Sequence, residues 1–460
     1  MPLSASAQFY VTGDDPGKFK WSYIETNHFR IIYPNGTDSL AKVYGTDLEH
    51  FYTPLSRTSG YLPNGNFGKK MPVMIHAYNA ANGSVAWAPN RMDLFTLPSA
   101  YDPEPLPWNK MLAIHEGRHV TQMQFGMTNA MKPGNYIFGQ MWNIAVTLIY
   151  PGIAFMEGDA VVTETAYTPS GRGRTSDFLN YYRIAFDEGV ERSWQQWRFP
   201  SQKNYSPSYY SLGYMAVGGL RYLYDIPELM NKGFDLASHR PYNLAAFRTN
   251  IKNLTGKRFK YAFKEICDTM AVIWKEEADA RAPYIPSEPV TKKPRLYTEY
   301  HNGVFVGNDF YAVKKGHLTT PVLIKIDPFL REKTVLRFAA DFGTMKKDGE
   351  GNLYWSESKS DPRWSLKTAS TIQKLENGRK RSTRIGKAGL KYNPTPTENG
   401  DSIAVVEYSV NGGSTLNIIR NSDIADSFEA PDSLQLVETA WSKDAKYIYA
   451  TAVSDNGYGI

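Results

Sequence analysis

The chain has 460 residues, of which 42% are hydrophobic and 14% aromatic, which is enough apolar material for large cores in roughly two or three domains. The formal net charge of +6 is spread along the chain, and its short basic clusters at 292–295 and 379–381 are typical of solvated loops. No apolar run reaches the roughly 18 residues of a membrane span. These observations argue against nucleic-acid-binding and membrane-spanning classes of protein.

The N-terminal segment carries part of the pattern of an export signal. Residues 3–8, Leu-Ser-Ala-Ser-Ala-Gln, have the small-x-small form of a signal-peptidase site, although the basic and apolar regions that should precede it are missing. Either the true start lies upstream or the match is a coincidence. We expect residues 1–20 to be the remnant of an export signal with a lead-in, and the protein to be bacterial and exported to the periplasm, the cell envelope or the medium.

The segment from Trp21 to about Leu97 has a mixed α/β pattern. The predicted elements are a strand at 28–33, a helix at 39–55, a strand at 71–76 and a strand at 84–89. From Pro107 to Arg281 nearly every segment favours helix, including 176–197, 209–224 and 259–280. The sequence therefore predicts one α+β domain over 21–281, made of a small mixed sheet and a helical lobe.

A metal-binding motif lies in the first of these helices. His115 and His119 are four residues apart, so both imidazoles can reach one ion from the same helix face, with Glu116 beside the first. This is the pattern of a zinc hydrolase. The alternative is a solvated helix face that carries two surface histidines, and a third ligand would decide between them.

Glu157 is the predicted third ligand. It lies in an otherwise apolar helix-like stretch, where an isolated carboxylate is costly unless it is paired or metal-bound. Glu164 follows two helical turns later on the same face, where it could accept the free N–H of a ligating histidine. The alternative for these carboxylates is a salt bridge to an arginine or lysine.

The motif at 115–119 followed by the Glu157-Gly158-x-Ala160 helix resembles the gluzincin metallopeptidases, in particular the bacterial peptidase-MA-like proteins. The resemblance implies one Zn²⁺ held by His115, His119 and Glu157, with Glu116 as general base and Glu164 supporting the site. The segment 205–213 is similar to the clan's Tyr-x-x-Gly segment, which implies Tyr210 as oxyanion donor, with Tyr205 or Tyr209 as the other choices. Departing from the family, the gap between His119 and Glu157 is longer than usual and requires a helical insertion over 126–150.

The resemblance also implies a substrate-binding edge strand. In gluzincins such a strand binds extended peptide by backbone pairing, and residues 84–87 resemble it. These four residues are the following: Ser84, Val85, Ala86 and Trp87.

A Pro-rich linker at 282–292 precedes a region with a different periodicity. Turn-then-strand phrases at 307–313, 351–356, 400–406 and 444–450 begin 44 to 49 residues apart, the length of a four-stranded propeller blade. They resemble TolB/WD40-like repeats, and the alternative is an unrelated β-sandwich. We expect 293–460 to hold about three or four blades of an incomplete propeller, within a longer polypeptide, with open edges that promote self-association.

The function predicted from these features is zinc-dependent hydrolysis of peptide bonds in a peptide or protein substrate. The alternative is a non-catalytic cell-envelope scaffold that uses the peptidase-like domain and the propeller for binding. Residues 136–150 could rest on a membrane surface as an interfacial helix. The single Cys267 lies in a helix-like pattern that favours a buried, inert thiol. Neither substrate nor oligomeric state follows from the sequence.

Overall fold

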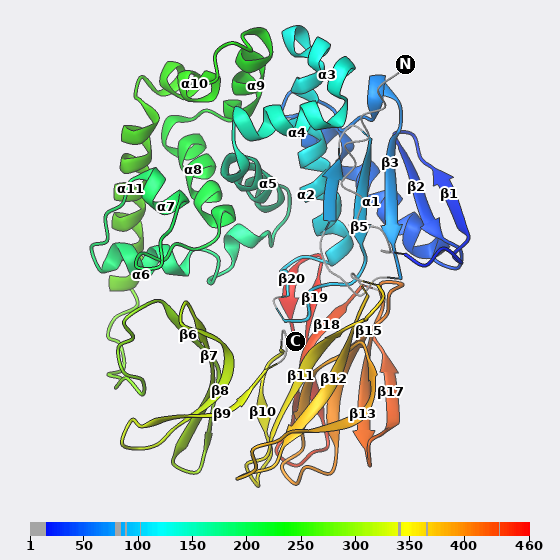
Figure 1. Cartoon of the computed structure of the whole chain (residues 1–460), viewed down its shortest axis with the longest axis vertical. Helices are drawn as coiled ribbons and strands as arrows, with labels where there is room; N and C mark the ends of the chain where they lie inside the picture. Colours follow the sequence, from blue (N-terminus) through cyan, green and yellow to red (C-terminus); the bar gives the residue numbers. More distant parts are fainter. Residues whose placement is uncertain are drawn as a thin grey trace.

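A computed structural model describes residues 15–78, 84–87, 90–101, 103–338, 342–364, 367–431 and 433–460, with the backbone alone for 84–87. The candidate cleavage site at 3–8 lies outside these residues. An α+β region with a small mixed sheet and many helices is followed by antiparallel sheets arranged like the blades of a propeller (Figure 1). The predicted fold class is thereby confirmed.

The mixed sheet has the order β1-β2-β3-β5-β4. Its strands are β1 Trp21–Glu25, β2 Phe29–Pro34, β3 Met71–His76, β4 Ser84–Trp87 and β5 Arg91–Phe95. The β2–β3 and β3–β5 pairs are parallel, while β1 and β4 pair antiparallel at the two edges. The sequence prediction lacked β1 and β5, which are short and contain polar residues.

Strand β4 is the edge strand that the resemblance singled out. It pairs with β5 in the register Ser84↔Leu94 to Trp87↔Arg91, and it lies next to helix α2 (Trp108–Met123). Its other side has no hydrogen-bonded strand among the residues that the structure describes. The backbone position therefore suits an added extended chain.

Helix α1 (Asp38–Ser56) and α2 pack with the sheet around one core, which includes Tyr44, Leu48, Val73 and Leu112. The α2 side chains from Met111 to Gln122 are buried without a break, so this helix runs through the interior. Polar side chains on such a helix need partners, because an unpaired buried polar group costs free energy.

The remaining helices form the lobe on the other side of α2 (Figure 1). They are α3 Lys132–Phe138, α4 Gln140–Ile149, α5 Ile153–Tyr167, α6 Asn180–Asp187, α7 Trp194–Arg198, α8 Tyr209–Tyr224, α9 Leu229–His239, α10 Ala246–Thr255 and α11 Phe259–Asp279. The expected insertion after His119 is helical and forms α3 and α4. Segment 176–197, predicted as a single helix, is instead divided into α6 and α7. Gly189, with φ of +70°, lies at the break, and the side chain of Ser193 caps α7.

Among the described residues, no single helix is long and apolar enough to cross a membrane. Helices α4 and α5 satisfy length and composition only when taken together, and they are bent by 93° at the break between them.

Four antiparallel sheets follow the helical lobe, each with its strands in sequence order. The strands of the first two are β6 Thr298–Val306, β7 Asp309–Gly316, β8 Thr319–Ile326, β9 Glu332–Arg337, β10 Lys346–Lys347, β11 Leu353–Ser360, β12 Thr368–Leu375 and β13 Thr383–Gly389. Those of the last two are β14 Lys391–Pro396, β15 Ile403–Tyr408, β16 Ser414–Arg420, β17 Asp423–Glu429, β18 Gln435–Trp441, β19 Ile448–Ser454 and β20 Gly457–Gly459. Each predicted turn-then-strand phrase leads into the second strand of its sheet. The periodicity thus located four successive sheets, with each phrase at the same position in its sheet.

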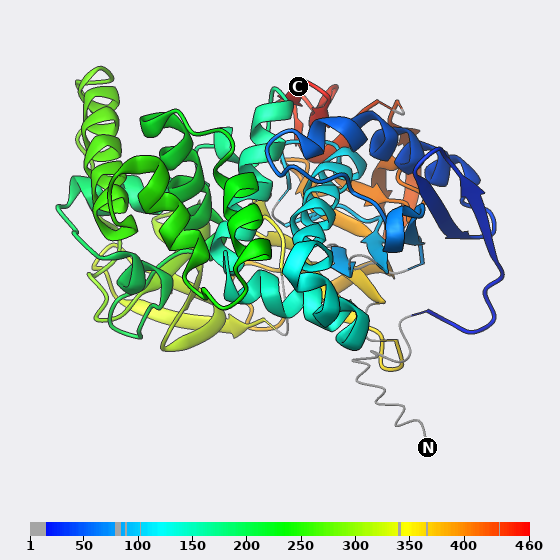
Figure 2. The same cartoon turned by 90° about the horizontal axis from the view of Figure 1, so that it is seen from above.

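The sheets lie along one side of the α+β region, with the first sheet (β6–β9) below the helical lobe and the other three below the mixed sheet in Figure 1 (Figures 1 and 2). Leu97 and Ala100 join a hydrophobic cluster with Tyr392, Tyr408 and other residues of the last two sheets. The Nζ of Lys110 lies 2.6 Å from Asp455 Oδ1 in the β19–β20 turn. The segment that leads into α2 is therefore held by the propeller-like region.

His76 provides a test of electrostatic stability in the mixed sheet. Its ring is buried between Asp15 (Nδ1–Oδ2, 2.7 Å) and Asp93 (Nε2–Oδ1, 3.2 Å). Burial by itself lowers the pKa of His76, but the two carboxylates outweigh it and raise the pKa from 6.5 to about 9. Because the folded-state value is the higher one, this stabilisation is fully present below pH 6.5 and is lost as the pH rises through about 9.

We therefore expect the free energy of unfolding of the wild type to fall between pH 6.5 and 9 relative to that of His76→Gln, by up to about 3 kcal/mol. Urea unfolding of both proteins at several pH values measures this difference. A difference that stays constant across the range would contradict the assignment.

Candidate metal centre

Three buried side chains meet between α2 and α5. The Nε2 atoms of His115 and His119 are 3.2 Å apart, and each lies 3.1 Å from Oε2 of Glu157. Each residue offers one ligand atom to a common point, so the group could hold a metal ion. The structure thus brings together the three residues that the sequence predicted as ligands.

The geometry and the donor types fit a tetrahedral ion. Three ligands at about 2.0–2.2 Å from one zinc ion are separated by about 3.3–3.6 Å from each other. The observed separations of 3.1 to 3.2 Å are close to this range. Two imidazoles and one carboxylate are also a usual donor set for an ion that keeps a fourth position open.

The electrostatics of the site favour a positive charge beside the Glu157 carboxylate. Burial raises the pKa of the Glu157 carboxyl, but the adjacent His119 and His115 outweigh this and hold it far below its usual value. In turn, burial lowers the pKa of His119, while the charge of Glu157 raises it to about 10. The carboxylate is therefore kept ionised and is balanced by a cation, which is either imidazolium or a bound metal.

A buried polar network behind the ligands fixes their orientation. Asp159 of α5 accepts from Nε of Arg118 at 2.7 Å, from Arg221 of α8 at 2.6 Å and from Nε2 of Gln122 at 2.7 Å. The Oε1 of Gln122 lies 2.7 Å from Nδ1 of His119. Because an amide oxygen can only accept, it selects the form of His119 with a proton on Nδ1, which leaves the Nε2 lone pair for a metal. The sequence analysis did not identify this network.

This arrangement predicts that Gln122 strengthens zinc binding indirectly, by orienting His119. In Gln122→Leu, the Nδ1 of His119 loses its acceptor, and we expect the affinity for zinc to fall by about 10- to 100-fold. Competition with a fluorescent chelator measures the affinity. Gln124→Leu removes another buried glutamine amide, one that donates to the Asn64 carbonyl at 2.6 Å instead of contacting a ligand, and should leave the affinity unchanged. An equal loss in both variants would indicate general damage around the end of α2.

Glu164 is fully buried and lies near the Nδ1 side of the His115 ring, away from the candidate metal position. Its Oε2 is 3.7 Å from Nδ1 of His115, and its Oε1 accepts from Nε of Arg172 at 2.6 Å. Arg172, in the 3-10 helix Arg172–Arg174, also places a terminal nitrogen 2.9 Å from His115 Nδ1. When His115 binds a metal through Nε2, its proton is on Nδ1, where Glu164 is an acceptor and Arg172 is not. The alternative salt bridge is therefore present at Glu164, and the carboxylate also lies close enough to His115 for the predicted supporting role.

Tyr210 lies over the same centre at the start of α8. Its ring stacks on that of His115 with the centroids 6.1 Å apart, and the Arg172 guanidinium lies 5.5 Å from the ring centroid. Burial, followed by the charge of Glu157, raises the pKa of its hydroxyl well above the usual value. Tyr210 therefore keeps its proton at neutral pH and can donate a hydrogen bond.

The other two candidate tyrosines have different surroundings. Tyr205 stacks on Tyr297 with centroids 3.4 Å apart, at the junction with the first propeller-like sheet. Tyr209 packs against Tyr210 and lies under the guanidinium of Arg198. Of the three, only Tyr210 has a ring contact with a candidate ligand.

Glu116 and a pair of glycines complete the site. Glu116 is 4% exposed, and its charge acts on both His119 and Tyr210, so it faces the same space.

Helices α5 and α8 touch at Gly158 and Gly213, where a Cβ on Gly213 would lie 1.7 Å from the Ala154 carbonyl oxygen. The glycine of the Tyr-x-x-Gly segment thus permits the close helix approach that brings Tyr210 beside His115.

Other sequence-predicted residues lie elsewhere. Cys267 is a partly buried free thiol in α11, and burial raises its pKa to about 12, as suits an inert side chain. Residues 84–87 are placed only as backbone, in β4 beside α2.

No protein-family model and no curated protein sequence matches this chain. Among solved structures, it is similar to TolB from Acinetobacter baumannii, with 12% identity and a TM-score of 0.27 over 34% of this chain and 42% of that one. The putative TolB from Agrobacterium tumefaciens has 15% identity and a TM-score of 0.26, over 35% and 60% of the two chains. The β-propeller domain of the Trilobed protease from Pyrococcus furiosus has 10% identity and a TM-score of 0.25, over 35% and 57%. The matched part is less than two thirds of each solved chain.

Proposed function

We propose that this protein is a zinc-dependent metallopeptidase of the gluzincin type. The observation that carries the proposal is the buried convergence of His115, His119 and Glu157 at 3.1 to 3.2 Å, with Glu116 beside them. A site with a purely structural metal has no need of a general base, so the presence of Glu116 favours catalysis over storage of an ion.

The chain's own residues divide the hydrolysis of an amide between them. A zinc ion held by the three ligands would supply an acidified water and polarise the scissile carbonyl. Glu116 takes a proton from the attacking water and later delivers it to the leaving amine. The Tyr210 hydroxyl donates to the oxygen on which negative charge develops, and its high pKa keeps that proton in place.

Substrate position and domain roles form part of the same proposal. An extended peptide would pair with the free edge of β4 at 84–87 and so reach past α2 to the ligands. We assign the peptidase domain to 21–281, the linker to 282–292 and the propeller to 293–460. Export from a bacterial cell, suggested by residues 3–8, is proposed on the sequence alone.

A non-catalytic scaffold is the second candidate, because the propeller-like sheets contact the segment that leads into α2 and could bind a partner together with it. Such contacts suit a binding protein as well as a gated enzyme. The scaffold has no use for Tyr210 and Glu116 at the ligand group, so we prefer the enzyme.

Cleavage of a mixed library of quenched fluorescent peptides by the full chain tests the proposal. We expect hydrolysis that stops on removal of metal with 1,10-phenanthroline and returns with one equivalent of Zn²⁺. A zinc-loaded protein that binds library peptides but cleaves none of them would support the scaffold instead.

A further inference from the structure

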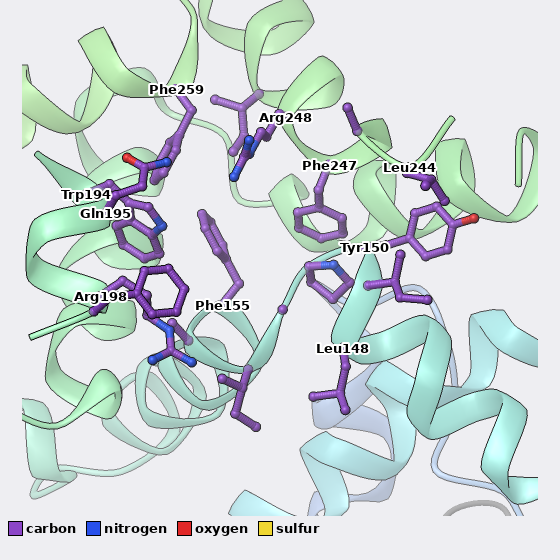
Figure 3. A pocket seen from close by; sticks show the side chains of 18 residues that line it. Leu148, Tyr150, Phe155, Trp194, Gln195, Arg198, Leu244, Phe247, Arg248 and Phe259 are labelled. Atoms are coloured by element: carbon purple, nitrogen blue, oxygen red, sulfur yellow. The ribbon is translucent and has the colours of Figure 1, made fainter. Parts of the chain in front are cut away.

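A cavity of about 630 Å³ lies in the helical lobe, away from the metal ligands. It is enclosed by the end of α4, the start of α5, helix α7, helix α10 and the first residue of α11 (Figure 3). Most of its lining is apolar, and the rings of Phe155, Trp194 and Phe247 surround it (Figure 3). Such a volume matches that of sites for small apolar ligands.

Two arginines give this cavity a positive rim. Arg198 and Arg248 both line it, and neither forms an ion pair with a carboxylate among the residues that the structure describes. Arg198 lies over the rings of Phe199 and Tyr209 instead, at 5.2 and 5.0 Å from their centroids. A cavity with an apolar interior and a cationic rim is suited to an anionic amphiphile.

The positive character extends well beyond the cavity. Every lining residue falls within 117–156, 192–224 or 236–264, and none of these three segments contains an aspartate or a glutamate. The last segment alone carries seven basic residues: Arg240, Arg248, Lys252, Lys257, Arg258, Lys260 and Lys264. Two of these seven are paired with acidic residues of α11, Lys257 with Glu265 and Lys264 with Asp268, so the excess positive charge is carried by the other five.

Large apolar side chains are exposed at the cavity and on the neighbouring helix α3. Leu148 and Leu244, which line it, are 53% and 66% exposed, and Phe199 is 69% exposed. On α3, which packs beside α4, Ile137 and Phe138 are 72% and 61% exposed. A single small ligand in the cavity would leave the α3 residues in water, so a larger apolar partner is required.

We propose that this face of the helical lobe docks onto the surface of an anionic lipid bilayer. Arg198, Arg248, Lys252 of α10 and Lys260 of α11 contact lipid phosphates, while the exposed residues of α3 and α4 enter the headgroup region. One acyl chain reaches into the cavity beside Trp194. A nucleic acid would satisfy the charge but not the aliphatic side chains, which favour lipid.

Sedimentation of the full chain with vesicles tests the proposal. We expect binding to vesicles of phosphatidylglycerol and phosphatidylcholine, but not to phosphatidylcholine alone. R198E/R248E should weaken binding on the order of a hundredfold, since each basic group near an anionic surface contributes strongly. The control K380E/R381E reverses two exposed basic residues of the propeller-like region and should bind like the wild type. Equal losses in the two variants would reject the assigned face, and so would binding of polyuridylate with no binding of vesicles.

A second variant and a spectroscopic readout separate surface attraction from insertion. I137S/F138S changes only exposed side chains and should weaken binding without affecting circular dichroism. Vesicles with brominated acyl chains should quench tryptophan fluorescence, and Trp194→Phe should remove part of that quenching. Unchanged binding by I137S/F138S, or quenching that does not depend on Trp194, would overturn the proposed insertion.

Discussion

Glu116→Gln should retain its zinc and lose about 10²- to 10⁴-fold in kcat for peptide hydrolysis. The amide has nearly the same shape as the carboxylate but cannot accept the proton of the attacking water. Zinc content by atomic absorption and turnover of a selected peptide, measured on the same preparation, give both quantities.

Glu191→Gln is the matched control, because Glu191 is an exposed glutamate away from the ligands. It should retain wild-type turnover. If Glu116→Gln cleaved the peptide as fast as this control, Glu116 would not be the base.

Tyr210→Phe should lower kcat by about 10²- to 10³-fold with little change in KM or in zinc content. The substitution removes only the hydroxyl, and the ring can still stack on His115. Because the hydroxyl donates to charge that develops during the reaction, its loss should affect turnover rather than binding of the substrate.

Tyr205→Phe and Tyr209→Phe serve as controls for this position, since they remove the same group from rings with other contacts. Each should change kcat by no more than a few fold. An effect at Tyr209 equal to that at Tyr210 would move the oxyanion role or divide it between the two.

The sequence was sufficient to predict the ligand group because periodicity alone places His115 and His119 on one helix face. Glu157 could be predicted because a lone carboxylate in an apolar helix needs a partner. The repeat length likewise predicted about three or four blades, and four antiparallel sheets are present. In each case the prediction rests on local sequence: the spacing of residues within one helix, or the recurrence of one turn-then-strand pattern.

The features that the sequence could not predict depend on distant contacts. Gln122 and Asp159 are 37 residues apart and resemble ordinary polar residues until α2 and α5 are packed together. Arg172 can be linked to the site only once the folded chain places its guanidinium against Glu164 and His115. The break between α6 and α7 was missed because the aromatic residues around Gly189 continue a helical pattern through it. Pairing of β1 and β5 depends on their neighbours in the sheet.

The metal content of His119→Ala tests the central claim most directly. The wild type should contain one zinc per chain after dialysis against excess Zn²⁺ and removal of free ion. His119→Ala should contain close to none, because only two of the three convergent ligands remain. His50→Ala, which removes an exposed histidine, should keep the wild-type ratio. A ratio near one in His119→Ala would contradict the assignment of the metal centre and, with it, the proposed chemistry.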